Sequence, residues 1–149
     1  MMRRGVSVIV SSCGIDLSPS LMRAVGSEVS ADGQRITVFL SRQQSARLLQ
    51  DVARSGRVAV VFSEPHSHRS VQVKSDRARV REATADDASG LQRYLQAMQG
   101  ELARVGFGAD FAAAMLAHRI EDVSAIEFTP GQAYDQTPGP KAGQRLGGA

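Results

Sequence analysis

The stretch whose side chains are best suited to bind a ligand is residues 69–74, in which polar and apolar residues alternate. Successive side chains of a strand point to opposite faces, so the two valines of this stretch can face a core. The other side then carries Ser70, Gln72 and Lys74, and with the guanidinium of Arg69 at the start of the strand it offers a guanidinium, a hydroxyl and an amide. Such a face suits a polar, anionic ligand.

The elements before this stretch must position it. Residues 58–62 form an unbroken β-branched and aromatic run, which is typical of a strand buried on both faces. Residues 63–67 break that pattern, and Pro65 indicates a loop. We therefore predict two strands joined by a polar loop.

Two histidines in and after this loop raise the question of a metal site. His66 and His68 are spaced so that both could bind one ion from a strand. A stable site needs three or four ligands, and the sequence offers no evident third one. We therefore predict no metal site.

Length and composition limit the class of protein. The chain has 149 residues, enough for one domain that buries about two-thirds of its unfolded surface. No stretch approaches the roughly 20 apolar residues of a membrane span, and the first ten residues lack the apolar region of a secretory signal. The single Cys13 cannot form an internal disulfide. These observations predict a cytoplasmic protein without a membrane partner.

The charge pattern argues against a nucleic-acid partner. The 18 Lys and Arg residues exceed the 15 Asp and Glu residues by three, and the basic residues are scattered along the chain. No basic cluster alternates with aromatic residues, as binding of single-stranded nucleic acid would require. The composition therefore favours a small anionic ligand and no nucleic acid.

Hydrophobic alternation predicts the remaining strands. An antiparallel meander is expected from residues 6–10, 21–29 and 36–40, with Asp32-Gly33 as a two-residue type I′ turn. Two further strands are expected at residues 77–82 and 123–128.

A period of 3.6 residues predicts three helices. The first begins at Ser41 or Ser45 and ends at Gly56, because a hydroxyl residue caps a helix start and glycine a helix end. The second begins at Thr84, whose hydroxyl precedes two early acids, and the third begins at Asp110. Together with the strands, these helices suggest a small closed barrel with helices at its ends.

Four motifs, by their order and spacing, resemble the pyridoxamine 5′-phosphate oxidase-like, FMN-binding split-barrel family. They lie at residues 19–23, 41–47, 55–62 and 68–74, and a weaker similarity extends over residues 123–143. The resemblance implies a mainly β fold, a six-stranded antiparallel split barrel with flanking helices. We expect one domain over residues 1–149, with a flexible C-terminal tail from about residue 141.

The resemblance also implies a cofactor and a partner. In such proteins FMN lies in a groove between the two subunits of a homodimer. Carried over residue by residue, the phosphate would meet Arg23, Ser45 and Arg47, assisted by Ser41. Arg69, Ser70 and Gln72 would approach the ring or ribityl chain, and His68 would neighbour the polar edge of the flavin, where an imidazole can exchange protons near neutral pH.

The C-terminal segment is expected to take part in this site. Tyr134 can anchor it by its ring, and two prolines lower the entropy cost of ordering it. We expect Gln136 and Thr137 to reach across the dimer to the flavin of the partner subunit. The alternative is that this segment only packs on its own barrel.

Three functions remain open from the sequence. The chain is a flavin-dependent oxidoreductase, a flavin-binding module without turnover, or a split barrel that uses another anionic cofactor such as a deazaflavin. Glu28 favours the third, because it replaces a lysine that the family commonly has five residues after the arginine matched by Arg23.

Overall fold

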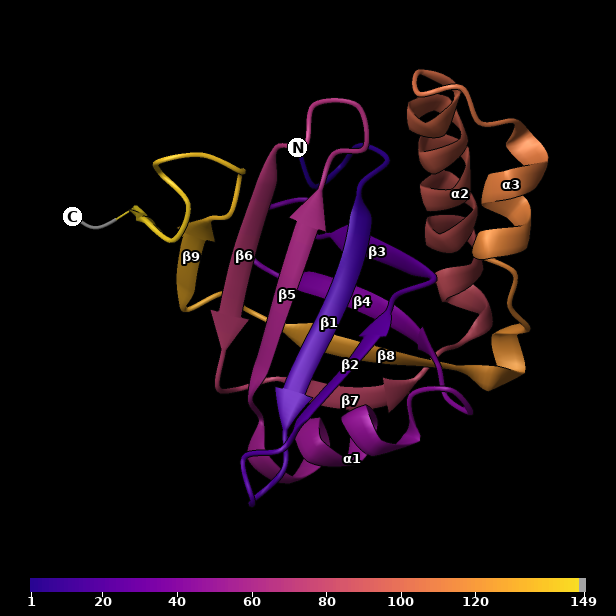
Figure 1. The fold of residues 1–149 in the computed structure, drawn as a ribbon. Helices are drawn as coiled ribbons and strands as arrows, with labels where there is room; N and C mark the ends of the chain where they lie inside the picture. Colours follow the sequence, from indigo (N-terminus) through magenta and orange to yellow (C-terminus); the bar gives the residue numbers. More distant parts are fainter. Residues whose placement is uncertain (148–149) are drawn as a thin grey trace.

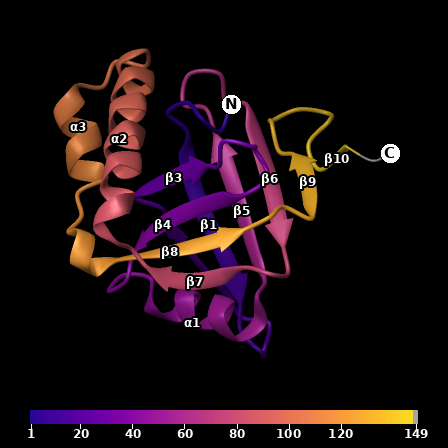
Figure 2. The same cartoon turned by 180° about the vertical axis from the view of Figure 1, so that it is seen from behind.

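The computed structural model describes residues 1–147. Its strands form two antiparallel sheets, seen from the front in Figure 1 and from behind in Figure 2. The six-stranded sheet contains, in spatial order, β10 (Arg145–Leu146), β9 (Gln132–Asp135), β6 (Ser70–Ser75), β5 (Val58–Ser63), β1 (Ser7–Cys13) and β2 (Pro19–Arg23). The four-stranded sheet contains β3 (Gly26–Val29), β4 (Ile36–Ser41), β8 (Val123–Phe128) and β7 (Arg79–Glu82).

The chain passes from one sheet to the other at Ala24 and Val25. The Ala24 N–H donates to the Val8 carbonyl of the six-stranded sheet at 2.9 Å, and the Val25 N–H donates to the Phe39 carbonyl of the four-stranded sheet at 2.8 Å. The stretch predicted as one strand over residues 21–29 is therefore two strands in different sheets. Neither residue at the crossing is Gly or Pro, and both are buried and apolar. The sequence therefore contains no local signal for the break before residue 26.

This crossing corrects the predicted architecture. The mainly β, antiparallel character is confirmed. The described residues form two sheets, of six and four strands, and not the closed barrel of six strands that the sequence suggested.

The core lies between the two sheets, where their inner faces meet. Val73 of β6 is buried as the alternation predicted, whereas Val71 is half-buried. The fully buried side chains of this layer come from both sheets: Val8, Val10, Val38, Leu40, Val60, Phe62 and Ile126.

Three helices surround the sheets (Figure 1). The helix α1 (Ala46–Ser55) lies against β1, β2 and β7, and Gly56 ends it in the left-handed conformation, as predicted, with φ 68°. The 3₁₀ turn η1 (Ala85–Asp87) leads into α2 (Ala88–Ala103), which packs on β3, and α3 (Ala109–Met115) packs on α2. A second 3₁₀ turn, η2 (Ile120–Asp122), precedes β8. No helix among residues 1–147 is both long enough and apolar enough to cross a membrane.

The connection between β3 and β4 differs from the predicted hairpin turn. Gly33 has a φ of 76°, but Asp32 is not among the non-glycine residues with positive φ, so the turn is not type I′. Instead, the Asp32 carboxylate accepts a hydrogen bond from the Gln34 N–H at 3.0 Å, and the Ser30 N–H donates to the Arg35 carbonyl at 2.9 Å. The aspartate thus stabilises a longer loop through its side chain.

The C-terminal segment adds two strands that the sequence did not predict. In register, β10 pairs Arg145 with Tyr134 of β9, and the Asp135 N–H donates to the Gln144 carbonyl at 2.8 Å. Flexibility of the chain from about residue 141 stays a prediction, and its last two residues, 148–149, lie outside the described residues.

Candidate functional site

The candidate site is the outer face of the six-stranded sheet, which we call the open face. It consists of the outward side chains of β2, β1, β5, β6 and β9. In Figure 1 this face points toward the viewer, and no helix lies over it. The helices instead lie at the end and side of the molecule, and most outward side chains of these strands are half-buried or exposed, whereas Ser70 is only 8% exposed.

A row of polar side chains crosses one end of the open face. Cross-strand register places Ser7 of β1 beside Ser63 of β5, and Ser63 beside Ser70 of β6. The hydroxyl oxygens of Ser63 and Ser70 are 2.8 Å apart, and the Arg23 guanidinium donates to the Ser7 hydroxyl at 2.9 Å. We call Arg23, Ser7, Ser63 and Ser70 the polar row.

The next row along the strands is largely apolar. Ile9 pairs with Arg23 on one side and with Val61 on the other, and Val61 pairs with Gln72 of β6. Both aliphatic side chains are only half-buried, because nothing packs on their outer side. The open face therefore offers a flat apolar surface bordered by hydrogen-bond donors.

The segment after β9 closes the polar row at its far end. The Ser70 N–H donates to the Thr137 hydroxyl at 3.1 Å, and the Gln136 N–H donates to the Ser70 carbonyl at 2.9 Å. Hydrogen bonds from Thr137 hold the pKa of Asp135 below its usual range. The Gln136 backbone and the Thr137 hydroxyl thus bond to β6 of their own chain, and a contact of this segment with the flavin of a partner subunit stays a prediction.

Two cations on the open face have no carboxylate partner among the described residues. Neither Arg23 nor Lys74 lies within ion-pair distance of an Asp or Glu in residues 1–147. The Lys74 ammonium instead lies 5.1 Å from the centroid of the Tyr134 ring. The open face therefore carries positive charge that the chain itself does not neutralise.

The other predicted phosphate ligands lie around the start of α1 and each has a different environment. The Ser41 hydroxyl donates to the Asp122 carboxylate at 2.7 Å, and the Gln43 N–H donates to the same carboxylate at 3.1 Å. This carboxylate already fills the position where a phosphate would meet the Ser41 hydroxyl and the Gln43 N–H.

Ser45 and Arg47 are likewise not gathered with Arg23. The Ser45 hydroxyl is buried without a partner among the described residues, and although Ser45 stands at the N-cap its side chain makes no capping hydrogen bond. Arg47 donates to the Ser18 hydroxyl, just before β2, whereas Arg23 ends that strand about 16 Å further along, at roughly 3.3 Å per residue. In this conformation the predicted phosphate ligands form two groups.

The loop between β5 and β6 places the remaining predicted residues at the rim of the open face. His68 has a φ of 57° and its N–H donates to the Glu64 carbonyl at 3.0 Å. The side chains of His68 and Arg69 are exposed next to the polar row. His66, in contrast, is engaged away from it, since its Nδ1 lies 2.7 Å from the Glu101 carboxylate of α2.

Sequence reasoning missed Ser7, Ser63, Ile9 and Val61 as parts of this face. Alternation alone indicates that each points opposite to its buried neighbours. Their meeting depends on the pairing of β1 with β5, which joins residues more than 50 positions apart, as in Ser7 with Ser63. No local signal gives that register.

The comparisons agree on the fold. No protein-family model and no curated protein matches the sequence. An F420 reductase aligns with a TM-score of 0.57 at 12% identity over 89% of this chain and 91% of that chain. A pyridoxamine 5′-phosphate oxidase-related, FMN-binding protein from Nostoc punctiforme aligns with a TM-score of 0.51 at 12% identity, over 95% of this chain and 78% of that chain.

A third solved structure, HupZ of Group A Streptococcus, aligns with a TM-score of 0.51 at 12% identity, over 93% of this chain and 90% of that chain. This chain has the pyridoxamine 5′-phosphate oxidase-like fold. The resemblance seen in the sequence is thereby confirmed at the level of the fold. At these identities the likeness carries no residue roles.

The open face of this pyridoxamine 5′-phosphate oxidase-like chain meets the general chemical needs of a flavin. A flavin presents a flat apolar face and a carbonyl edge that accepts hydrogen bonds. Ile9 and Val61 supply the flat surface, and the Gln72 amide and the Ser7 hydroxyl supply donors, whereas the Ser70 hydroxyl already donates to the His68 carbonyl at 3.1 Å. The unneutralised Arg23 suits a phosphate better than the start of α1, where Asp122 already lies.

Proposed function

We propose that this chain binds a flavin on the open face. The observation that supports the proposal is the polar row beside the half-buried Ile9 and Val61, on a sheet face that the chain leaves uncovered. Arg23 would hold the phosphate by charge-assisted hydrogen bonds. The Gln72 amide would donate to the ring or ribityl oxygens, and Ser70, whose hydroxyl donates to the His68 carbonyl, would hold His68 and Arg69 at the rim beside the ring.

We further propose that the chain is a flavin-dependent oxidoreductase of a small molecule. A bound flavin supplies hydride or electron transfer, and the chain's own residues bind it, orient it and exclude water from one of its faces. His68, exposed at the rim, would lie beside a substrate bound over the flavin. A flavin carrier without turnover would use the same contacts and would not oxidise or reduce a second molecule.

A deazaflavin is the second candidate cofactor, and the F420 reductase among the neighbours favours it. Glu28 itself no longer favours a deazaflavin over a flavin. Glu28 lies in the four-stranded sheet and pairs with Arg93 of α2 at 2.8 Å, so it does not face the proposed flavin. A visible spectrum of the purified protein distinguishes the two cofactors.

We propose that a second copy of the chain covers the open face and completes the flavin site. Leu21 of β2 is 62% exposed on this face, and Ala59 and Val61 of β5 are only half-buried. The sequence predicts a strand with two apolar faces, and the single chain buries only one of them. In such a homodimer the side chain of Gln136 would remain available to the partner's flavin, although its backbone is bonded to Ser70 of its own chain.

Titration with FMN and with riboflavin tests the proposed site. Arg23→Ala should weaken FMN binding by about 1.5–3 kcal/mol, the range for a hydrogen bond to a charged group, and leave riboflavin binding nearly unchanged. Arg47→Ala is the matched control, because Arg47 contacts Ser18 away from the polar row. The proposed phosphate position would be wrong if Arg47→Ala weakened FMN and Arg23→Ala did not, and equal binding of FMN and riboflavin by the unaltered protein would exclude any phosphate site.

A further inference from the structure

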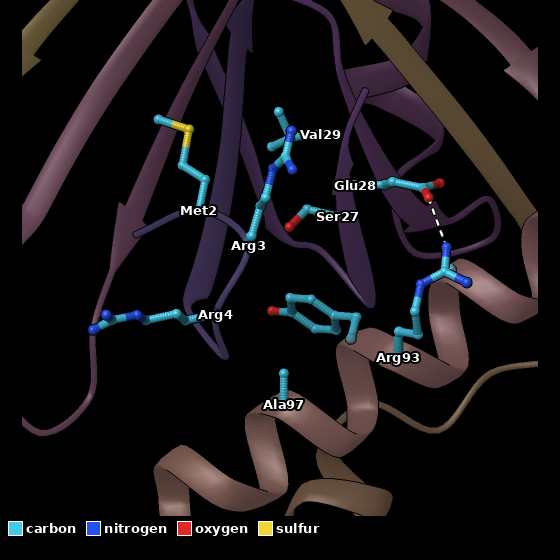
Figure 3. Close-up of a pocket in the computed structure, with 10 residues that line it drawn as sticks. Met2, Arg3, Arg4, Ser27, Glu28, Val29, Arg93 and Ala97 are labelled. Carbon is cyan, nitrogen blue, oxygen red and sulfur yellow. Dashed lines mark hydrogen bonds and ion pairs between the residues drawn. The ribbon is translucent and has the colours of Figure 1, made fainter. Parts of the chain in front are cut away.

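A polar hollow lies outside the open face, between the N-terminal segment, β3 and α2 (Figure 3). It has a volume of about 300 Å³. The residues that bear on its chemistry are Arg3, Arg4, Ser27, Glu28, Arg93 and Tyr94. We call it the N-terminal hollow.

The hydroxyl of Ser27 is the feature that the fold does not explain. Ser27 is only 8% exposed, and its Oγ has no hydrogen-bond partner among the described residues. Figure 3 shows this oxygen pointing into the space between Arg3 and α2. A buried hydroxyl without a partner is unfavourable, so a bound molecule that hydrogen-bonds to it would recover that cost.

The charge around the hollow is positive. Three guanidinium groups line it, from Arg3, Arg4 and Arg93, against one carboxylate, Glu28. Glu28 is already paired with Arg93 at 2.8 Å, and Arg4 has a long contact of 4.0 Å to Glu64 outside the lining. Arg3 contacts only neutral oxygens, the carbonyls of Ser30 at 2.8 Å and Ala31 at 3.2 Å. A small anion would therefore meet excess positive charge.

The remaining walls are fixed in place. The Tyr94 hydroxyl donates to the Val6 carbonyl at 2.6 Å and is thus not free to bind a ligand, but its ring forms an apolar wall. Gly5 lets the N-terminal segment approach α2 closely, since a Cβ at that position would lie 2.1 Å from the Ala97 carbonyl oxygen. The hollow is therefore built by the fold and is not a gap left by a loose chain end.

We propose that the N-terminal hollow binds a small organic oxyanion, with its phosphate or carboxylate group between the arginines and the Ser27 hydroxyl. The Tyr94 ring would contact the organic part. The volume suits a small metabolite, and none of the residues that line the hollow belongs to the open face, so this site is separate from the proposed flavin site and does not rest on it.

Calorimetric titration of the full chain with phenyl phosphate, benzoate and inorganic phosphate tests the proposal. We expect saturable one-to-one binding of an organic oxyanion, with Ser27→Ala lowering the affinity about 3- to 10-fold and Arg3→Gln about tenfold or more. Comparison of phenyl phosphate with benzoate identifies the preferred oxyanion. Ser45→Ala and Arg47→Gln are the matched controls: the first removes the other buried unpaired hydroxyl and the second an arginine near α1, and neither residue lines the hollow.

The same variants separate the proposal from its alternatives. Without ligand, Ser27→Ala should melt at the same temperature as the unaltered protein or higher, because it removes an unpaired buried group. Equal affinity in Ser27→Ala, or a lower melting temperature without ligand, would show that the hollow holds only water. An equal loss in Arg47→Gln and Arg3→Gln would mean unspecific attraction by surface charge.

Competition between phenyl phosphate and the flavin tests whether the N-terminal hollow is separate from the flavin site. Saturating phenyl phosphate should leave both FMN and riboflavin binding unchanged if the N-terminal hollow is a separate site. If phenyl phosphate competes with FMN and not with riboflavin, and Ser27→Ala abolishes this competition, the hollow is the phosphate site of the flavin and the proposal is overturned. Absence of flavin binding altogether would refute the proposed function and leave this site untouched.

Discussion

The outer faces of the two sheets differ in what covers them: α2 packs on the four-stranded sheet, whereas no helix lies over the six-stranded sheet in Figure 1. On the four-stranded sheet, Leu91 of α2 belongs to a buried cluster with Phe39 and Ala125, and the arginines Arg81 and Arg93 beside this cluster are paired with Asp87, Glu127 and Glu28. On the six-stranded sheet, no helix covers the half-buried Ile9 and Val61, and Arg23 has no acidic partner in residues 1–147. A face that the chain covers and neutralises serves stability, whereas a face left open and charged is available for a ligand or partner.

Arg81 on the four-stranded sheet and Arg23 on the six-stranded sheet allow the most direct comparison of the two outer faces. Arg81 of the four-stranded sheet donates to both oxygens of Asp87, at 2.8 and 2.9 Å, and to Glu127 at 2.8 Å. Arg81→Ala leaves the largely buried Asp87 carboxylate without its main partner, so we expect a loss of about 2–3 kcal/mol in the free energy of unfolding. Urea denaturation measures it.

Arg23→Ala is the matched change on the open face. It removes a single hydrogen bond to an exposed hydroxyl, and we expect a change in unfolding free energy within about 0.5 kcal/mol. Equal destabilisation by the two substitutions would contradict the division into a structural and a functional face.

The packing of α2 on the covered face gives the next largest effect. Gly26 of β3 lies beneath Leu91, and a Cβ there would come within 2.6 Å of its Cδ2. Gly26→Ala should therefore force Leu91 aside and cost about 1–2 kcal/mol of stability. Ala59→Val adds methyl groups on the open face, where we expect a change below about 0.5 kcal/mol by the same measurement. A larger effect of Ala59→Val than of Gly26→Ala, measured on the monomer, would show that the open face is packed within the chain.

Acid should weaken the covered face specifically. Hydrogen bonds from Arg81 are the main reason why the pKa of Asp87 lies below its ordinary value, with the Thr84 N–H contributing. The unfolded chain, whose Asp has a pKa of about 3.9, then binds the proton more tightly. This contribution is fully present above that value and is lost as the pH falls through the lower pKa of the folded state.

The comparison of two proteins isolates this contribution from those of other acids. Unfolding free energies from pH 7 down to pH 3 should fall more steeply for the unaltered protein than for Arg81→Ala. Parallel curves would mean that the contact between Arg81 and Asp87 does not lower the pKa of Asp87.

The two faces also differ in how far the sequence predicts them. The alternation of residues 69–74 gave the outward direction of Ser70 and Gln72, because a strand has a fixed period of two. The meeting of Ser7 with Ser63 was not predictable, since register between distant strands depends on the whole fold. The crossing at Ala24 and Val25 was missed for a similar reason: two buried apolar residues continue a strand pattern even where their N–H groups bond to different sheets.

The helix start shows a different limit. Ser41, Ser45 and Arg47 have the residue types of an anion site, and the sequence has no means of showing that Asp122 would bond to Ser41 from 81 positions away. An acid within the chain can occupy the place of a ligand, so a phosphate motif in sequence predicts a site only when the tertiary structure leaves it free.

At Leu21 we expect the smallest effect on stability and the most specific effect on dimer formation. This side chain is 62% exposed on the open face, so Leu21→Lys should change the unfolding free energy of the isolated chain by no more than about 0.5 kcal/mol. If a second copy covers this face, burying a lysine there without a partner charge is costly, and sedimentation at micromolar concentration should shift from dimer to monomer. Phe111→Lys is the control, because Phe111 is 46% exposed on α3 and stacks on Phe107 away from the six-stranded sheet. A dimer that survives Leu21→Lys and dissociates in Phe111→Lys would place the interface on the helical side and leave the open face to the ligand alone.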